Sequence, residues 1–266
     1  KTRVPRFDYL GFVLFSIAAG GLLFIIELIN ETWMSTFIFV VVTSILSIIM
    51  LIYIFHAKRV NNAIINLKLF KIDSLNNVAT GGFFAGASNS GSIFLMPLFF
   101  QIGLAYTPLF SGALLGIYML GIMVQKVVNE RGLSAFGARA WMGSGAFISV
   151  IALLSFYFVT SSSHYYTIIV IVLLQGFGVS VLATNYHILF YYDVSSELQG
   201  QASSFANVVQ QMSRAVGIAV AGLALEFFRG IVPQDFDIEL SAFHDSFVLM
   251  GAFVLIAGLI FMQLKF

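Results

Sequence analysis

The sequence has no cysteine, only 4 prolines and few charged side chains among its 266 residues. Without cysteine the chain can form no disulfide, no cysteine–zinc site, no iron–sulfur cluster and no thiol nucleophile. Charged residues make up 9% of the chain, against about 25% in a soluble globular domain. The net charge of +1 provides no field that would recruit a nucleic acid. A soluble enzyme, a disordered chain and a nucleic-acid-binding protein are therefore excluded.

Hydrophobic residues, by contrast, make up 59% of the chain. A membrane-spanning helix needs roughly 20 apolar residues, and the runs without Asp, Glu, Lys or Arg supply such lengths. Two runs are too long for one crossing and break at turn signals near 103–108 and 161–164. The runs are continuous rather than alternating, which excludes a β-barrel. We predict an all-α integral membrane protein with eight transmembrane helices, near 9–26, 32–55, 75–101, 108–128, 140–160, 165–190, 199–228 and 245–264.

The distribution of Lys and Arg predicts the orientation in the membrane, because cytoplasmic loops are enriched in both. They gather in the N-terminal tail, in the loop after the second span, in the loop after the fourth span and at Lys265. The loop 193–198 should also be cytoplasmic, but its charged residues are all acidic. Acidic residues contribute little to the orientation of a membrane protein, so the assignment is kept. We expect a multi-pass plasma (inner) membrane protein with both termini of this chain in the cytoplasm.

The most basic stretch divides the chain. Residues 56–73 interleave Lys with Ile, Leu and Phe, and predict a basic amphipathic cytoplasmic loop lying on the bilayer surface. Residues 1–55 are then a two-helix transmembrane hairpin, and residues 74–266 a six-helix bundle. The chain begins at Lys1 rather than Met, so we expect either a fragment of a longer protein or a processed chain.

The seventh span carries a polar stripe. At about 100° per residue, Asn207, Gln211 and Arg214 lie on one arc of the helix, which predicts a water-filled cavity open to one side. An Arg near the bilayer centre costs roughly 2.5–3.5 kcal/mol or more unless it faces protein or water. Arg214 therefore needs a partner: a carboxylate, helix-end carbonyls or an anionic group of a substrate. The alternative is a structural ion pair between two helices.

Two other spans carry weaker polar patterns. Thr184 and His187 share a face of the sixth span with Ser180 and Tyr191, and His187 either relays protons or is hydrogen-bonded inside the bundle. Ser88 and Asn89 belong to the third-span segment Ser88–Ser92, which either unwinds to line a cavity or forms a packing notch. Pairs of small residues four apart predict close helix contacts, at Gly82/Gly86, Gly112/Gly116 and Gly217/Ala221.

Motifs of catalysis are missing from the sequence. It contains no GxxxxGK[ST] phosphate loop, no HExxH and no paired metal carboxylates. We therefore expect neither an enzyme, nor a bound metal, nor a cofactor.

Several short segments form a recognisable set in their order and spacing: Phe7–Gly11, Trp33, Ile64–Phe70, Met96–Gln101, Thr107–Gly112, Asn129–Arg131, Gly137–Arg139, Gly176–Gly178, Val194–Ser204 and Gly217–Ala219. Together they resemble the fourteen-span drug/proton antiporters of the major facilitator superfamily. The resemblance implies that spans one and two are the two extra helices of that family, and that spans three to eight are its C-terminal six-helix half. It also implies a missing N-terminal six-helix half that holds the proton-coupling acids, a proton gradient as energy source, and a periplasmic adaptor.

The chain departs from the family pattern at Arg214, where a small residue is common, and at Thr184 and Asn185, where Pro is common. These departures disfavour a generic pocket for cationic drugs, and favour anionic or zwitterionic substrates or an internal ion pair.

Two hypotheses for function follow. In the first, the chain is the C-terminal half of a proton-coupled multidrug or small-molecule efflux transporter working by alternating access. The substrate cavity is then lined by Ser88, Asn89, Thr184, His187, Asn207, Gln211 and Arg214. In the second, it is a half-size membrane subunit or scaffold that assembles through its polar helix faces.

Overall fold

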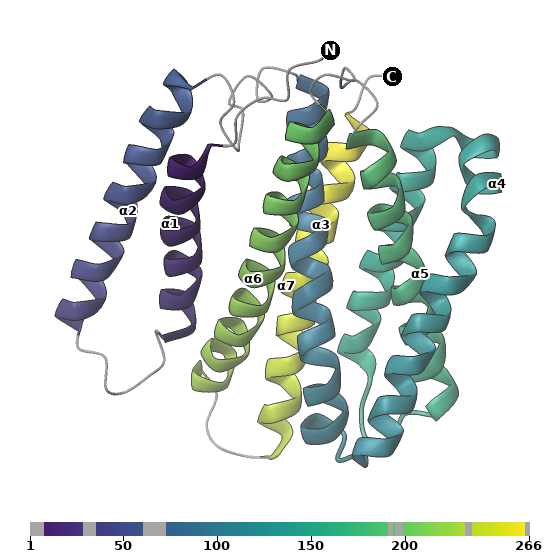
Figure 1. The fold of residues 1–266 in the computed structure, drawn as a ribbon. Coiled ribbons are helices and arrows are strands. Elements are labelled where there is room, and N and C mark those ends of the chain that lie inside the picture. The colour runs from purple at the N-terminus through teal and green to yellow at the C-terminus, as the bar shows by residue number, and fades with distance from the viewer. Residues whose placement is uncertain are drawn as a thin grey trace. The chain divides into compact units, whose positions relative to one another are not determined.

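The computed structural model describes residues 8–28, 36–60, 73–190, 194, 199–231 and 236–263, and every element in these ranges is helical (Figure 1). The α-helices are α1 (Tyr9–Leu28), α2 (Thr36–Arg59), α3 (Asp73–Leu98), α4 (Pro108–Ser155), α5 (Tyr165–Phe190), α6 (Gln199–Ile231) and α7 (Phe236–Met262). A π-helical turn, η2 (Phe99–Gly103), follows α3, and a 3-10 turn, η3 (Phe156–Phe158), follows α4.

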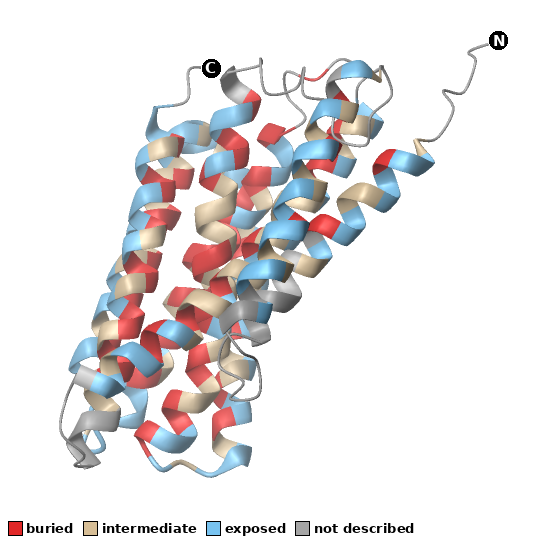
Figure 2. Cartoon of the chain, turned by 90° about the vertical axis from the view of Figure 1, so that its left-hand side faces the viewer, coloured by how far each residue is buried: buried red, intermediate tan, exposed pale blue. Residues whose placement is uncertain are grey.

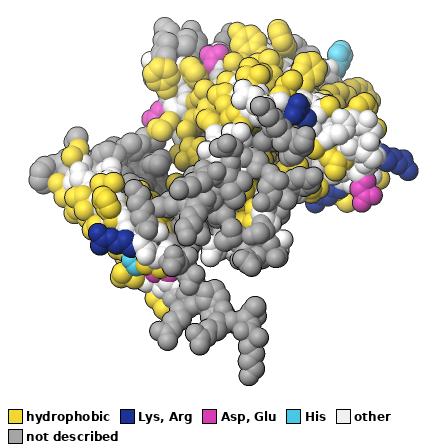
Figure 3. Space-filling model, turned by 90° about the horizontal axis from the view of Figure 1, so that it is seen from above, with side chains coloured by type: hydrophobic (Ala, Val, Ile, Leu, Met, Phe, Trp, Pro, Cys, Tyr) yellow, Lys and Arg dark blue, Asp and Glu magenta, His cyan; other side chains and the backbone are white. Residues whose placement is uncertain are grey.

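Six helices in the described ranges are long and apolar enough to cross a membrane. Along them buried and exposed positions alternate (Figure 2), and many of the exposed side chains are large and apolar, such as Leu109 at 86% and Phe158 at 79% exposure. Hydrophobic side chains also dominate the described part of the surface in Figure 3, where Lys and Arg are few. Such a surface suits contact with lipid rather than water. The sequence predicted eight spans, two more than these six helices, and the number eight stays a prediction.

One reason for the lower count is that α4 bends back on itself at Gly137 and is counted once (Figure 1). The backbone of Gly137 has φ 75°, which L side chains rarely adopt and glycine adopts readily. Trp141 stacks on Phe136 across this bend, with ring centroids 6.2 Å apart. The expected loop between residues 128 and 140 is therefore wrong, because helix continues on both sides of a one-residue turn.

The chain forms two compact units, and the first joins residues 1–76 with 194–208. Within it, α1 packs against α2: Asp8 accepts a hydrogen bond from the backbone N–H of Gly11 at 2.9 Å and pairs with His56 at 2.9 Å. The Phe15 and Tyr53 rings lie 5.2 Å apart. Because α2 continues to Arg59, it includes the first residues of the loop expected at 56–73, while residues 61–72 of that loop lie outside the described ranges.

The second unit joins residues 77–193 with 209–266. An aromatic cluster holds one end of it together: the Phe99 ring lies 5.7 Å from Phe156 and 5.5 Å from Phe247, and Phe156 stacks on Phe247 at 4.4 Å. All three side chains are fully buried. The turn expected at 103–108 is confirmed, since Thr107 caps α4 there and Pro108 occupies its first turn.

Small residues let α3 and α6 approach closely within the second unit. A Cβ added to Gly217 would collide with the backbone of Ala87, and one added to Gly91 would lie 2.8 Å from the Gly217 carbonyl oxygen. The pair Gly112/Gly116, in contrast, faces open space. Close contact of helices through small residues is the usual packing mode in lipid, where burial of apolar groups gives little driving force.

Candidate functional site

A cavity of about 120 Å³ lies between α3, α5 and α6, and all its lining residues belong to the second unit. Its α3 wall includes Gly82, Ala85 and Gly86. A Cβ added to Gly82 would collide with the Tyr186 ring and one added to Gly86 with Ser213, so these glycines let α3 lie close to α5 and α6. The α5 residues Val179, Leu182, Ala183 and Tyr186 also line it, and the polar lining residues are Asn89, Ser90, His187, Gln210, Ser213 and Arg214. The sequence therefore folds into a small polar chamber within an apolar helical unit.

Arg214 supplies the positive charge of this cavity. Its guanidinium stays protonated at any physiological pH. Arg214 is exposed, and none of the carboxylates in the described ranges forms an ion pair with it. The structural ion pair considered from the sequence is thus not formed by the described residues. An anionic group of a bound molecule remains a suitable partner.

His187 and Gln210 form a contact across the cavity wall between α5 and α6. The Nε2 atoms of the two side chains lie 2.9 Å apart. When the imidazole nitrogen carries no proton, the amide N–H of Gln210 donates to it. His187 therefore lines the cavity and is hydrogen-bonded to Gln210, while a role in proton relay stays a prediction.

Asn89 is held in place from α4. The hydroxyl of Tyr118, a residue only 1% exposed, donates to Oδ1 of Asn89 at 2.6 Å. Since the amide oxygen accepts this bond, the amide N–H groups of Asn89 remain as donors toward the cavity. Together with Arg214 they give a cavity that offers hydrogen-bond donors.

Four of the seven expected site residues do not line this cavity. Ser88 is fully buried and donates to the Met250 carbonyl of α7 at 2.7 Å. Thr184 faces Gln125 of α4, with its hydroxyl 3.5 Å from Oε1. Gln211 is exposed and lies one residue, about 100°, around the helix from Gln210. Asn207 is also exposed, and belongs to the first unit.

The segment Ser88–Ser92 remains helical within α3 rather than unwinding. Ser92 donates to the Ser88 carbonyl at 2.7 Å, as serines in membrane helices commonly do. Gly91 packs against α6 and α7, whereas Asn89 and Ser90 line the cavity, so the helical segment provides both a packing notch and part of the cavity wall.

A buried polar network that sequence reasoning missed joins both arms of α4 to α5. Oδ1 of Asn129 accepts from Gln125 at 2.7 Å, from Trp141 at 3.0 Å and from Asn185 at 3.0 Å. Ser180 donates to Oε1 of Gln125 at 2.7 Å. The available signal was the pair of amides at 125 and 129, four residues apart on one helix face. The network stabilises the bend of α4 beside the cavity-bearing helices.

The helical fold agrees with what comparison with known proteins finds. The family model of the Major Facilitator Superfamily matches residues 7–218 and 78–265. The chain therefore belongs to the Major Facilitator Superfamily, a family of multi-pass membrane transporters rather than enzymes, as the sequence resemblance predicted.

Curated relatives bear names that refer to transport. The chain is 26% identical over 96% of its length to HsrA of Haemophilus influenzae, which is named as a transport protein. It is 27% identical over 91% of its length to MdtD of Salmonella typhimurium, which is named as a multidrug resistance protein. The matches cover 55% and 51% of those two proteins, so the chain spans about half the length of the curated relatives it matches.

Proposed function

We propose that this chain is the C-terminal portion of a proton-coupled exporter of small molecules, which works by alternating access and is incomplete without an N-terminal half of six helices. The observation that carries this proposal is the polar cavity containing Arg214 within an apolar membrane bundle. The half-length match to transport proteins supports it.

The substrate class follows from the lining chemistry. Arg214, Asn89 and Gln210 offer N–H donors, and no Asp or Glu is among the described residues that line the cavity. Such a wall favours a carboxylate, phosphate or other anionic group over a cation. We therefore favour anionic or zwitterionic substrates, with Arg214 as the anchoring charge.

Movement between inward-open and outward-open states requires the two halves to rock around a midplane site. Our proposal places the proton-carrying acid in the half outside this chain, because His187 is the only titratable side chain besides Tyr186 and Arg214 among the described lining residues. The eight spans, the cytoplasmic termini, the plasma membrane location and a periplasmic adaptor are parts of the same proposal.

Transport by the full-length protein in proteoliposomes tests the coupling. An imposed pH gradient is expected to drive accumulation of a fluorescent organic anion, and a protonophore is expected to abolish it, because proton flow is the proposed energy source. Accumulation that ignores the pH gradient would contradict proton coupling. Residues 1–266 alone are expected to give no accumulation, since half of the cavity wall is missing. Transport by these residues alone would instead support a half-size subunit that assembles with itself.

A further inference from the structure

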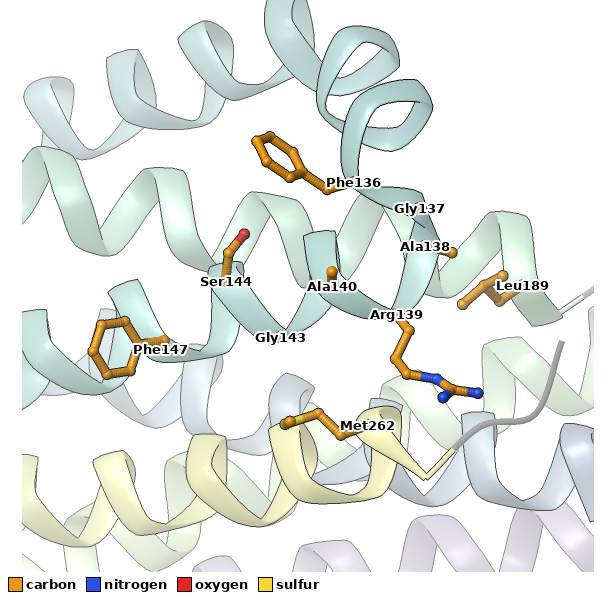
Figure 4. A pocket seen from close by; sticks show the side chains of 10 residues that line it. All are labelled: Phe136, Gly137, Ala138, Arg139, Ala140, Gly143, Ser144, Phe147, Leu189 and Met262. Atoms are coloured by element: carbon orange, nitrogen blue, oxygen red, sulfur yellow. The ribbon is translucent and has the colours of Figure 1, made fainter.

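A second and larger hollow lies away from the polar cavity, at the bend of α4. It is a groove of about 970 Å³ bordered by the bend, the end of α5 and the end of α7 (Figure 4). Its walls are mainly apolar and include Phe147, Leu189 and Met262. Gly137 and Gly143 contribute no side chain, which leaves the groove open between these helices.

The groove also has one charged wall residue, Arg139. In Figure 4 its side chain extends from α4 toward the end of α7 that carries Met262. Lys126, Glu130 and Arg131, which precede the bend in α4, are also exposed but do not line the groove. The groove thus joins an apolar trough to one positively charged side chain, Arg139.

The position of the bend agrees with a site at the lipid–water boundary. Charged residues cluster around Gly137, whereas both arms of α4 that lead away from it are apolar. Lys and Arg at the ends of membrane spans lie at the interface with the headgroups. Phe147 follows Arg139 by eight residues, which places it ~12 Å further along the helix, on the hydrocarbon side.

We propose that this groove binds an anionic glycerophospholipid, with its phosphate at Arg139 and an acyl chain along Phe147 and Met262. A guanidinium binds phosphate through two parallel hydrogen bonds, and its positive charge favours a headgroup with net negative charge. The apolar wall explains why a lipid, rather than a free phosphate, is the occupant. The site is independent of the polar cavity and of the proposed transport activity.

Native mass spectrometry of the purified full-length protein tests this site. The protein is incubated with equal amounts of phosphatidylglycerol and phosphatidylcholine, and the lipids retained after detergent removal in the gas phase are counted. We expect the wild type to retain phosphatidylglycerol about five-fold better than phosphatidylcholine. Arg139→Gln is expected to remove that preference. Arg131→Gln, which changes a neighbouring Arg outside the groove lining, is expected to keep it.

A second variant keeps the test decisive if Arg139→Gln does not fold. Gly143→Leu fills the groove while leaving Arg139 in place, and is expected to lower phosphatidylglycerol retention about five-fold. A Cβ at this position has no neighbour closer than 3.7 Å, so the backbone tolerates the change. Equal retention of the two lipids by the wild type, or unchanged retention in both groove variants, would overturn the proposal. The proposal would also be overturned if the full-length protein formed a dimer through this groove that retained no lipid, and if Gly143→Leu made that dimer dissociate.

Discussion

Replacing Arg214 by Gln is expected to lower efflux of an organic anion about ten- to a hundred-fold in the full-length transporter. The substitution keeps a polar side chain in the cavity but removes its permanent charge. A hydrogen bond to a charged group contributes about 1.5–3 kcal/mol, and each 1.4 kcal/mol is about a factor of ten in affinity. The measurement is efflux of a panel of fluorescent anions and cations from cells, at matched protein levels.

A control on the same helix separates the cavity charge from charge in general. Arg229 lies in the last turn of α6 and is not among the cavity residues. Arg229→Gln is expected to leave anion efflux within about two-fold of the wild type, as surface substitutions usually change energies by less than ~0.5 kcal/mol. Cation efflux should not fall in Arg214→Gln. Anion efflux that is equal in Arg214→Gln and wild type would remove Arg214 from substrate binding.

Replacing Asn129 by Leu is expected to cause the largest loss of stability, lowering the melting temperature of the full-length protein by at least ~5 °C. Oδ1 of Asn129 accepts from Gln125, Trp141 and Asn185, and the substitution leaves these three side chains, of which Gln125 and Asn185 are buried, without that acceptor. Each unsatisfied buried group costs about 1–3 kcal/mol. Thermal unfolding in detergent, followed by intrinsic fluorescence, measures the effect.

The matched control is Glu130→Leu, at the next position along α4. Glu130 is exposed, whereas Asn129 is 6% exposed. A shift below ~2 °C is expected for Glu130→Leu, because no buried partner loses its acceptor. Similar melting temperatures for the two variants would mean that the network does not hold α4 and α5 together.

Hydrophobic runs alone predicted the helical class and most helix positions, because lipid requires every backbone group to be paired within its own segment. The span expected at 165–190 coincides with α5. The sequence predicted a loop between residues 128 and 140, whereas the structure has two helical arms joined by a bend at Gly137. Charged residues occur both in loops and at helix ends, so those around Gly137 did not distinguish the two.

The candidate site was predicted in part. One cavity is lined by Arg214, His187 and Asn89, which lie on three separate helices. The sequence predicted that each would face a cavity, but it could not show that the three helices pack against one another there. Ser88 and Thr184 instead face neighbouring helices, since sequence periodicity gives the arc of a polar side chain but not the helix packed against it. Asn129 was missed because the spacing of the amides at 125 and 129 shows that they share a helix face but not that this face is buried.

The most direct measurement is labelling of a cysteine at the cavity wall with a membrane-impermeant maleimide. Ser90 lines the cavity, whereas Ser92, two residues along α3, is 1% exposed. In a full-length protein with no other cysteine, Ser90→Cys is expected to react and to be protected by a transported anion, while Ser92→Cys is expected not to react. Failure of Ser90→Cys to react from either side of the membrane, or reaction that no transported molecule slows, would contradict a substrate cavity at Arg214.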